Sequence, residues 1–136
     1  MAINGLGRIG RAALKVLLDA DGLNLVAVND IADVDNLAYL LKYDTVYGRY
    51  HREVATADGA LLIDGRRIAA FAEHDPANLP WADLGVDLVL ECAGVFKDED
   101  GLKKHLQAGA SYVILSAPTT SEAVPTVVHG VNRPRR

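Results

Sequence analysis

The chain alternates between short apolar runs and segments with helical spacing. Residues 23–28, 86–91 and 112–115 are largely apolar stretches, which are typical of strands in a parallel sheet covered on both faces. Before and after the first of these stretches, apolar residues recur every three or four positions over 9–20 and 34–41, as on one face of a helix. In the first helical segment these residues are Ile9, Ala13, Val16, Leu17 and Ala20. The order predicts an α/β fold with a mainly parallel, doubly wound sheet and right-handed crossovers.

Capping and turn residues mark where further elements begin and end. Asp33 and Asp98 precede helical patterns and are suitable N-caps, and Gly109 follows the second of these patterns as a C-terminal glycine would. Asp75-Pro76 indicates a turn or a helix start. A last strand is expected over the apolar residues 126–128.

Residues 53–72 have a different pattern from the rest of the chain. Two turn signals, Asp58-Gly59 and Asp64-Gly65, separate short strand-like runs around 61–63 and 68–71. An antiparallel ribbon inserted into the α/β alternation is therefore expected here, with the parallel sheet resuming after it.

A glycine motif, Gly5-Leu6-Gly7-Arg8-Ile9-Gly10, follows a strand that only residues 1–4 can form. At this place in a strand-turn-helix unit, Gly5 permits the tight turn, Gly7 lets a pyrophosphate approach the backbone, and Gly10 lets helix and strand pack closely. The phosphate would lie at the helix N-terminus. The spacing alone is weak support, because three glycines in six residues also occur in ordinary loops.

Asp30 supports the interpretation of the glycine motif as part of a dinucleotide-binding site. It lies twenty residues beyond Gly10, at the end of an apolar strand, where a carboxylate can bind the adenosine ribose hydroxyls. Its charge would repel a 2′-phosphate, so NAD is preferred over NADP. The alternative is that Asp30 only caps a helix or holds a turn. Together the two features predict a Rossmann-type dinucleotide-binding domain over residues 1–136.

The strand ends supply further candidates, because ligands of open α/β sheets lie beyond the carboxyl ends of the strands. By this rule the candidates are Asn29, Gly94, Val95, Ser116 and Ala117. The backbone N–H groups of Arg8 and Ile9 lie in the turn that would hold the pyrophosphate. The alternatives are a solvated first helical residue for Arg8 and a turn residue before Pro118 for Ser116.

Composition limits the class of protein. The chain has 136 residues, half of them apolar, which is enough for one domain with a core. A net charge of -4 and a pI near 5.5 argue against nucleic acid or an anionic membrane as the main partner. The basic end Arg133-Pro134-Arg135-Arg136 is interpreted as a solvated terminus.

Three absences in the sequence favour a cytoplasmic protein. A single cysteine, Cys92, excludes an internal disulfide. No apolar run approaches the roughly 20 residues of a membrane-spanning helix. The N-terminus also lacks the charged start and apolar middle of a signal peptide.

No residue of the chain qualifies as a catalytic or metal-binding group. Cys92 follows an apolar strand and matches no activated-thiol motif, so a small, buried or semi-buried role is expected. The four histidines lack metal-ligand spacing, and Asp98 and Asp100 are explained by helix capping. These histidines are His51, His74, His105 and His129.

Several motifs in order resemble one enzyme family. They are Ala2-Ile3-Asn4-Gly5-Leu6-Gly7-Arg8-Ile9-Gly10-Arg11, Val28-Asn29-Asp30, Leu40-Leu41-Lys42-Tyr43-Asp44, Gly94-Val95-Phe96, Ser116-Ala117-Pro118 and Gly130-Val131-Asn132. This set resembles the N-terminal half of phosphorylating glyceraldehyde-3-phosphate dehydrogenases, and the similarity covers residues 2–132. The related erythrose-4-phosphate dehydrogenases share much of it but more often have glutamate at the position of Asp30.

The resemblance implies a role for several of these residues. Backbone groups of Arg8 and Ile9 would hold the pyrophosphate, Gly94 and Phe96 would lie near the adenine, and Ser116 would lie on the nicotinamide side. His74 stands where the family commonly has arginine or lysine near the adenine, and Leu6 where phenylalanine is usual. The complete predicted cofactor set is Asn4, Gly5, Gly7, Arg8, Ile9, Gly10, Asn29, Asp30, Ile31, His74, Gly94, Val95, Phe96, Ser116 and Ala117.

The resemblance also implies that catalysis belongs to residues that this sequence does not contain. In the family, a cysteine in a Ser-x-x-Cys-Thr-Thr-Asn-Cys segment attacks the aldehyde, a histidine acts as base, and hydride passes to NAD. The expectation is an NAD-binding domain without its catalytic domain, from a parent enzyme that forms a homo-oligomer. Two alternatives stay open: a parent acting on erythrose 4-phosphate, and a stand-alone nucleotide-binding module.

Overall fold

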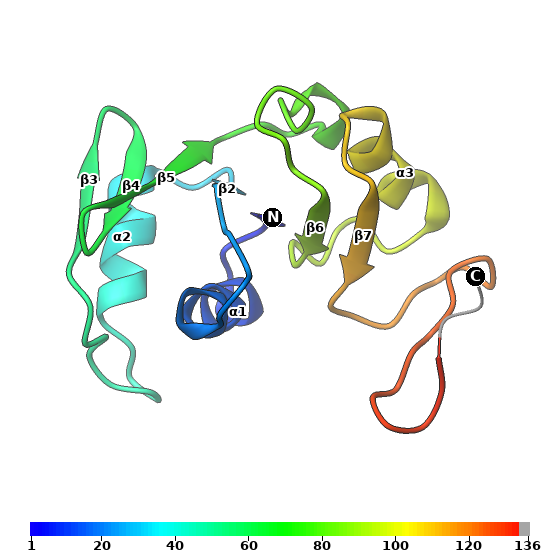
Figure 1. The fold of residues 1–136 in the computed structure, drawn as a ribbon, viewed down its shortest axis with the longest axis horizontal. Coiled ribbons are helices and arrows are strands. Elements are labelled where there is room, and N and C mark those ends of the chain that lie inside the picture. The colour runs from blue at the N-terminus through cyan, green and yellow to red at the C-terminus, as the bar shows by residue number, and fades with distance from the viewer. Residues whose placement is uncertain (134–136) are drawn as a thin grey trace.

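The computed structural model describes residues 1–133, so Pro134-Arg135-Arg136 of the predicted solvated terminus lie outside the described residues. One seven-stranded sheet has the strand order β3-β4-β5-β2-β1-β6-β7 (Figure 1). The strands are β1 (Ala2–Asn4), β2 (Ala27–Asn29), β3 (Val54–Ala57), β4 (Ala60–Ile63), β5 (Arg66–Phe71), β6 (Leu88–Glu91) and β7 (Tyr112–Leu115). The helices are α1 (Arg8–Asp19), α2 (Val34–Lys42), α3 (Glu99–Gln107) and the 3₁₀ helix η1 (Pro76–Asn78).

The parallel part of the sheet winds outward from β1 in both directions. β1 pairs in parallel with β2 on one side and with β6 on the other, and β2 and β6 continue in parallel to β5 and β7. The chain therefore reverses its direction of winding between β1 and β6. A crevice outside the carboxyl ends of the strands at such a reversal is the usual ligand site of doubly wound folds. The predicted fold class is confirmed.

The antiparallel ribbon is also confirmed, with one difference in its last strand. Asp58 and Gly59, and likewise Asp64 and Gly65, have positive φ at both turn positions, as two-residue hairpin turns of type I′ require. The difference is that residues 69–71 of β5 pair in parallel with β2. The ribbon is thus not a separate insertion, since its last strand belongs to both parts of the sheet.

The core lies on both faces of the parallel strands. Successive residues of a strand point to opposite faces, so Ile3 packs in one cluster with residues of α1 and α2, and Ala2 packs in a second cluster with Trp81. Both Ile3 and Trp81 are fully buried. This double burial explains why the strands have continuous apolar runs rather than alternating ones.

The predicted helix caps are confirmed. The Asp33 carboxylate accepts the N–H of Asp35 at 2.9 Å, and the Asp98 carboxylate accepts the N–H of Gly101 at 2.8 Å. Gly109 follows α3 with φ +114° and lies so close to Ala82 that a Cβ would come within 2.5 Å of the Ala82 side chain. Local chemistry therefore sets where α2 and α3 begin and where α3 ends.

The apolar face expected for α1 was partly wrong. The buried residues of the helix are Gly10, Leu14 and Leu17, whereas Ile9 and Val16 are 58% and 68% exposed. The reason is the close approach at Gly10, where a Cβ would lie 1.9 Å from the carbonyl oxygen of Gly5. This contact turns the Gly10 side of the helix toward the sheet and leaves Ile9 outside.

Two expected strands also differ. β2 spans 27–29 rather than the predicted 23–28, because β1 offers three residues to pair with it. The strand expected over 126–128 is absent. The N–H of Val128 is bound instead by the side chain of Asn132 at 2.6 Å. An apolar run without a neighbouring strand has no ladder to join.

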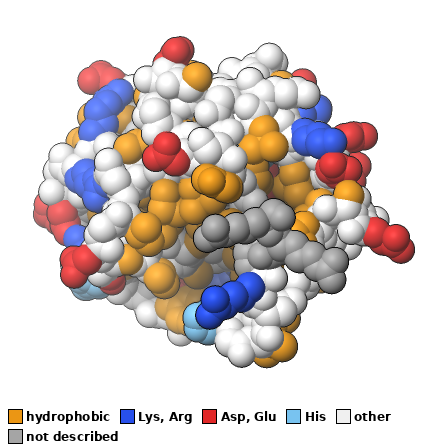
Figure 2. Space-filling view, turned by 45° about the vertical axis from the view of Figure 1, so that its right-hand side comes forward, with side chains coloured by type: hydrophobic (Ala, Val, Ile, Leu, Met, Phe, Trp, Pro, Cys, Tyr) orange, Lys and Arg blue, Asp and Glu red, His pale blue; other side chains and the backbone are white. Residues whose placement is uncertain are grey.

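Apolar side chains are exposed at the β7 edge of the sheet. Tyr112 and Ile114 of β7 are 70% and 52% exposed, and Val127, Val128 and Val131 of the C-terminal segment are also exposed. Hydrophobic side chains gather on the face that Figure 2 turns forward. An apolar surface of this kind is typical of a face that another part of a protein covers.

A pair of glycine substitutions tests the packing of the first βα unit. Gly10→Ala places a methyl group inside the Gly5 carbonyl, so the free energy of unfolding should fall by about 2 to 3 kcal/mol in urea titrations. The Cβ added by Gly7→Ala meets no atom of residues 1–133 within 4 Å, apart from its chain neighbours, and should cost less than about 1 kcal/mol. Equal losses for the two variants would contradict the close approach.

Candidate functional site

The parallel strands end at one edge of the sheet, and most of the predicted cofactor residues follow these ends. Backbone bonds extend beyond the strands at this edge: Gly5 N–H donates to Asn29, Cys92 N–H to Asn4, and Ser116 N–H to Glu91. The segments brought together there are 5–10 after β1, 30–31 after β2, residue 74 after β5, 94–96 after β6 and 116–117 after β7.

The glycine loop, residues 5–10, combines two crowded positions with one open position. Gly5 has φ +92°, and a Cβ on it would lie 2.5 Å from the backbone of Ala93. A Cβ on Gly10 would overlap the Gly5 carbonyl. At Gly7, by contrast, a Cβ would meet no atom of the described residues within 4 Å. The loop thus packs tightly against the end of β6 and leaves its backbone accessible at Gly7.

The N-terminus of α1 offers hydrogen-bond donors that residues 1–133 do not use. Its N-cap, Gly7, has no side chain to cap the helix, and the first turn contains no acidic residue. Among the described residues, no partner accepts the N–H groups of Arg8, Ile9 and Gly10, whereas the N–H of Arg11 binds the Gly7 carbonyl. Such a helix end attracts anions through its free N–H groups and its dipole.

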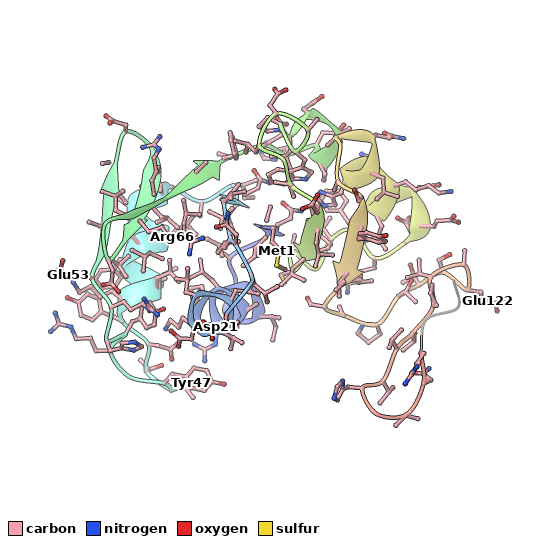
Figure 3. The ribbon with its side chains drawn as sticks, viewed as in Figure 1. Met1, Asp21, Tyr47, Glu53, Arg66 and Glu122 are labelled. Carbon is pink, nitrogen blue, oxygen red and sulfur yellow. The ribbon has the colours of Figure 1, made fainter. Side chains whose placement is uncertain are left out.

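The Arg8 side chain contacts the segment after α2. Its guanidinium donates to Asp44 at 2.8 Å and lies over the ring of Tyr47, which Figure 3 labels on that segment. Hydrogen bonds from the N–H groups of Tyr47 and Val46, together with Arg8, lower the pKa of Asp44 to about 2. The Arg8 side chain is half exposed, so the solvated interpretation holds for part of it.

Asp30 is held rigidly by backbone groups. One carboxylate oxygen accepts the N–H of Leu6 at 2.7 Å, and the other accepts the N–H of Ala32 at 2.9 Å. The bond from Ala32 corresponds to the turn role that the sequence analysis left as an alternative. The bond from Leu6 joins the end of β2 to the glycine loop. Each oxygen keeps a second lone pair, so both can still accept a hydroxyl group.

Exposed apolar side chains surround this edge. Ile9, Ile31 and Val95 are 58%, 66% and 75% exposed, each directly after a strand end or at the start of α1. Phe96 is half-buried beneath the Lys104 ammonium, whose nitrogen lies 5.9 Å from the ring centroid. The edge therefore combines free backbone donors with apolar surface, as nucleotide sites commonly do.

The remaining predicted residues differ in accessibility. His74 and Ser116 are exposed and Ala117 is partly buried. Asn4 and Asn29 are 2% and 3% exposed, and their side-chain amides bind protein partners. These two asparagines lie beneath the edge and support it.

Sequence reasoning missed three polar residues of this region. Glu91, His105 and Trp81 are fully buried and hydrogen-bonded to one another in series. The available signals were a carboxylate ending an apolar strand and a histidine three positions after Leu102 on the helix face that is buried. Neither signal indicates its partner, because the three residues are far apart in the sequence.

Cys92 is half-buried, as expected. Burial raises the pKa of its thiol, and a hydrogen bond with Ser116 opposes this shift only in part. A thiol with a raised pKa is a poor nucleophile. Within residues 1–133, no group of three or more metal-ligating side chains is found, and no helix is long and apolar enough to cross a membrane.

Comparisons with known proteins agree on one family. Residues 1–99 match the family model described as glyceraldehyde 3-phosphate dehydrogenase, NAD binding domain. Glyceraldehyde-3-phosphate dehydrogenase 1 of Kluyveromyces lactis is 53% identical over 97% of this chain and 40% of its own length. The glyceraldehyde-3-phosphate dehydrogenase of Mycoplasma pneumoniae is 48% identical over 97% of this chain and 39% of its own length. The chain thus spans about 40% of the length of these relatives.

Acid unfolding tests the Asp44 contacts. The folded-state pKa of about 2 lies below the ordinary value of 3.8, so the stabilisation is present above pH 3.8 and is lost as the pH falls toward 2. In thermal unfolding across this window, the wild-type midpoint should fall more steeply than that of Asp44→Asn. Parallel curves down to about pH 2 would contradict the role of these hydrogen bonds.

Proposed function

The chain belongs to the glyceraldehyde 3-phosphate dehydrogenase family, in the part that binds NAD, and from this premise we propose how it holds the dinucleotide. The pyrophosphate lies against Gly7 and accepts the free N–H groups of Arg8 and Ile9. The observation that carries the proposal is the combination of an open Gly7 with an uncapped helix N-terminus. A pyrophosphate is the anion that such a loop fits.

Asp30 binds the hydroxyls of the adenosine ribose and selects NAD over NADP. Both carboxylate oxygens are fixed by backbone N–H groups, so the side chain does not rotate away from a ligand without breaking two bonds. A 2′-phosphate at this point would face a fixed negative charge, and repulsion between like charges in a partly buried site is costly.

The other residues at the carboxyl ends of the parallel strands contact the two ends of the cofactor. Ile31, His74, Gly94, Val95 and Phe96 surround the adenine, for which exposed apolar side chains and an exposed imidazole ring offer contact. Ser116 and Ala117, at the end of β7, lie on the nicotinamide side. Asn4 and Asn29 are buried beneath the cofactor and hold the strand ends in place through their hydrogen bonds.

The parent protein oxidises an aldehyde with transfer of hydride to NAD, in keeping with the names of the relatives and of the family, and it also phosphorylates the aldehyde, as the resemblance of the sequence motifs implies. Those names favour glyceraldehyde 3-phosphate over erythrose 4-phosphate as the substrate. The nucleophile and base belong to a catalytic domain outside residues 1–136, and the parent is a cytoplasmic homo-oligomer. The raised thiol pKa of Cys92 supports this division, since the cysteine of this chain is unsuited to attack an aldehyde. Residues 1–136 alone bind the cofactor without turnover.

Gly7→Ala tests the pyrophosphate site. The added methyl group occupies the space where the phosphate approaches, so the Kd for NAD should rise at least about tenfold in calorimetric titrations while the fold persists. Ser111→Ala, at the amino end of β7 on the opposite edge of the sheet, is the matched control and should leave the Kd unchanged. Unaltered NAD binding by Gly7→Ala would place the pyrophosphate elsewhere.

Cofactor choice tests Asp30. Titration of the wild-type chain with NAD and with NADP should give a Kd for NADP at least about tenfold higher. Asp30→Asn removes the charge and places an amide N–H₂ against a backbone N–H. It should therefore raise the Kd for NAD and reduce the ratio of the Kd for NADP to the Kd for NAD. If the wild-type chain bound NADP as tightly as NAD, or more tightly, the result would contradict selection of NAD by Asp30.

A further inference from the structure

A continuous chain of buried polar side chains crosses the sheet beneath the proposed cofactor edge. It runs from β2 through β1 and β6 to α3 and then to the segment that follows η1. Every member is at most 3% exposed. In order, the members are Asn29, Asn4, Glu91, His105 and Trp81.

The direction of the hydrogen bonds is fixed at the β2 end by the backbone of Glu73. The side-chain oxygen of Asn29 accepts the Glu73 N–H at 2.8 Å, and its Nδ2 donates to the Glu73 carbonyl at 2.9 Å. This Nδ2 also donates to the side-chain oxygen of Asn4 at 2.7 Å. The Nδ2 of Asn4 must therefore face Glu91, and it donates to Oε2 at 2.6 Å.

At the other end the direction is fixed by Trp81. An indole N–H can only donate, and it donates to Nδ1 of His105 at 3.0 Å. The ring proton of a neutral His105 is therefore on Nε2, which donates to Oε2 of Glu91 at 2.8 Å. Both ends of the chain thus direct a donor at the same carboxylate.

Glu91 also holds the turn that follows β6. Its second oxygen, Oε1, accepts the N–H of Ala93 at 2.7 Å. Three donors thus converge on two oxygens, a pattern that a carboxylate satisfies and a side-chain amide does not, because an amide has one acceptor oxygen and one donor nitrogen.

The turn at Ala93 packs directly against the glycine loop at Gly5. A Cβ on Gly5 would lie 2.5 Å from both N and Cα of Ala93, so the two backbones are in direct contact. Any displacement of Ala93 is therefore transmitted to Gly5 and to the N–H groups that follow it.

We propose that Glu91 is a positioning residue for dinucleotide binding, whose carboxylate holds the Ala93 turn and through it the glycine loop. The inference rests on the proposed NAD site and adds a residue that does not touch the cofactor. Asn4 and Asn29 on one side and His105 and Trp81 on the other fix the orientation of this carboxylate.

Glu91→Gln tests the requirement for a carboxylate at nearly constant volume. In either orientation, the glutamine amide places N–H₂ against an N–H donor, at Ala93 or at Asn4 and His105. The Kd for NAD should rise about tenfold or more at a temperature where the variant is fully folded. Ile63→Val, a buried substitution in the ribbon, is the matched control that lowers the thermal midpoint without a change in Kd. NAD binding by Glu91→Gln as tight as that of the wild type would overturn the proposal.

A second substitution distinguishes positioning from general destabilisation. Trp81→Phe removes the indole N–H, so His105 becomes free to carry its proton on Nδ1 and to accept at Nε2 from the amide that Glu91→Gln introduces. The double variant Glu91→Gln/Trp81→Phe should therefore bind NAD several-fold more tightly than Glu91→Gln alone. If the two substitutions acted only as independent packing defects, their losses of NAD affinity would add. Additive losses in the double variant would therefore contradict the directed network.

A third measurement does not depend on the cofactor. In amide NMR spectra without NAD, Glu91→Gln should shift the resonances of Ala93, Gly5 and Leu6 and speed hydrogen exchange at Ala93. Unchanged resonances at Gly5 and Leu6 would overturn the link from Glu91 to the loop. A wild-type chain that does not bind NAD would instead refute the proposed function, and the NMR result would still decide the link.

Discussion

The close approach of three backbone segments at Gly5 is the constraint on which the rest of the structure depends. Gly5 contacts the turn at Ala93 on one side, and its carbonyl fills the space where Gly10 would carry a Cβ on the other. This packing leaves no room for side chains between β1, α1 and the end of β6. It sets how α1 lies on the sheet, and it leaves Gly7 as the accessible point of the loop.

Electrostatics at this edge are arranged around fixed backbone donors. The N–H of Leu6 is taken by Asp30 and the N–H of Ala93 by Glu91, so two carboxylates hold the loops from opposite sides. The N–H groups of Arg8 and Ile9 have no acceptor in the described part of the chain, and they are the ones that a pyrophosphate would use. A partly buried acid and a fully buried acid thus shape a site whose ligand is itself an anion.

Features set by neighbouring residues were predictable from the sequence. The caps at Asp33 and Asp98, the two Asp-Gly turns and the glycine loop each depend on a few consecutive residues, and the structure has all of them. The position of Asp30 beside the glycine loop was predictable because its distance from the glycine motif reflects the length of one βα unit.

Features set by contacts between distant residues were not predictable. The rotation of α1 depends on a clash between Gly10 and Gly5 that no hydrophobic pattern records, so Ile9 and Val16 were placed on the wrong face. Residues 126–128 look like a strand, but the sequence does not say whether a partner strand is present. The link from Trp81 to Glu91 through His105 likewise depends on the packing of α3 and not on spacing.

A crystal structure of residues 1–136 with NAD examines the proposed site directly. The pyrophosphate oxygens should lie within hydrogen-bond distance of the N–H groups of Arg8 and Ile9, and the adenosine ribose hydroxyls within reach of Asp30. The Ala93 turn should keep its bond to Glu91 in the complex. A dinucleotide bound away from the glycine loop, or one whose ribose does not contact Asp30, would contradict this description of the site.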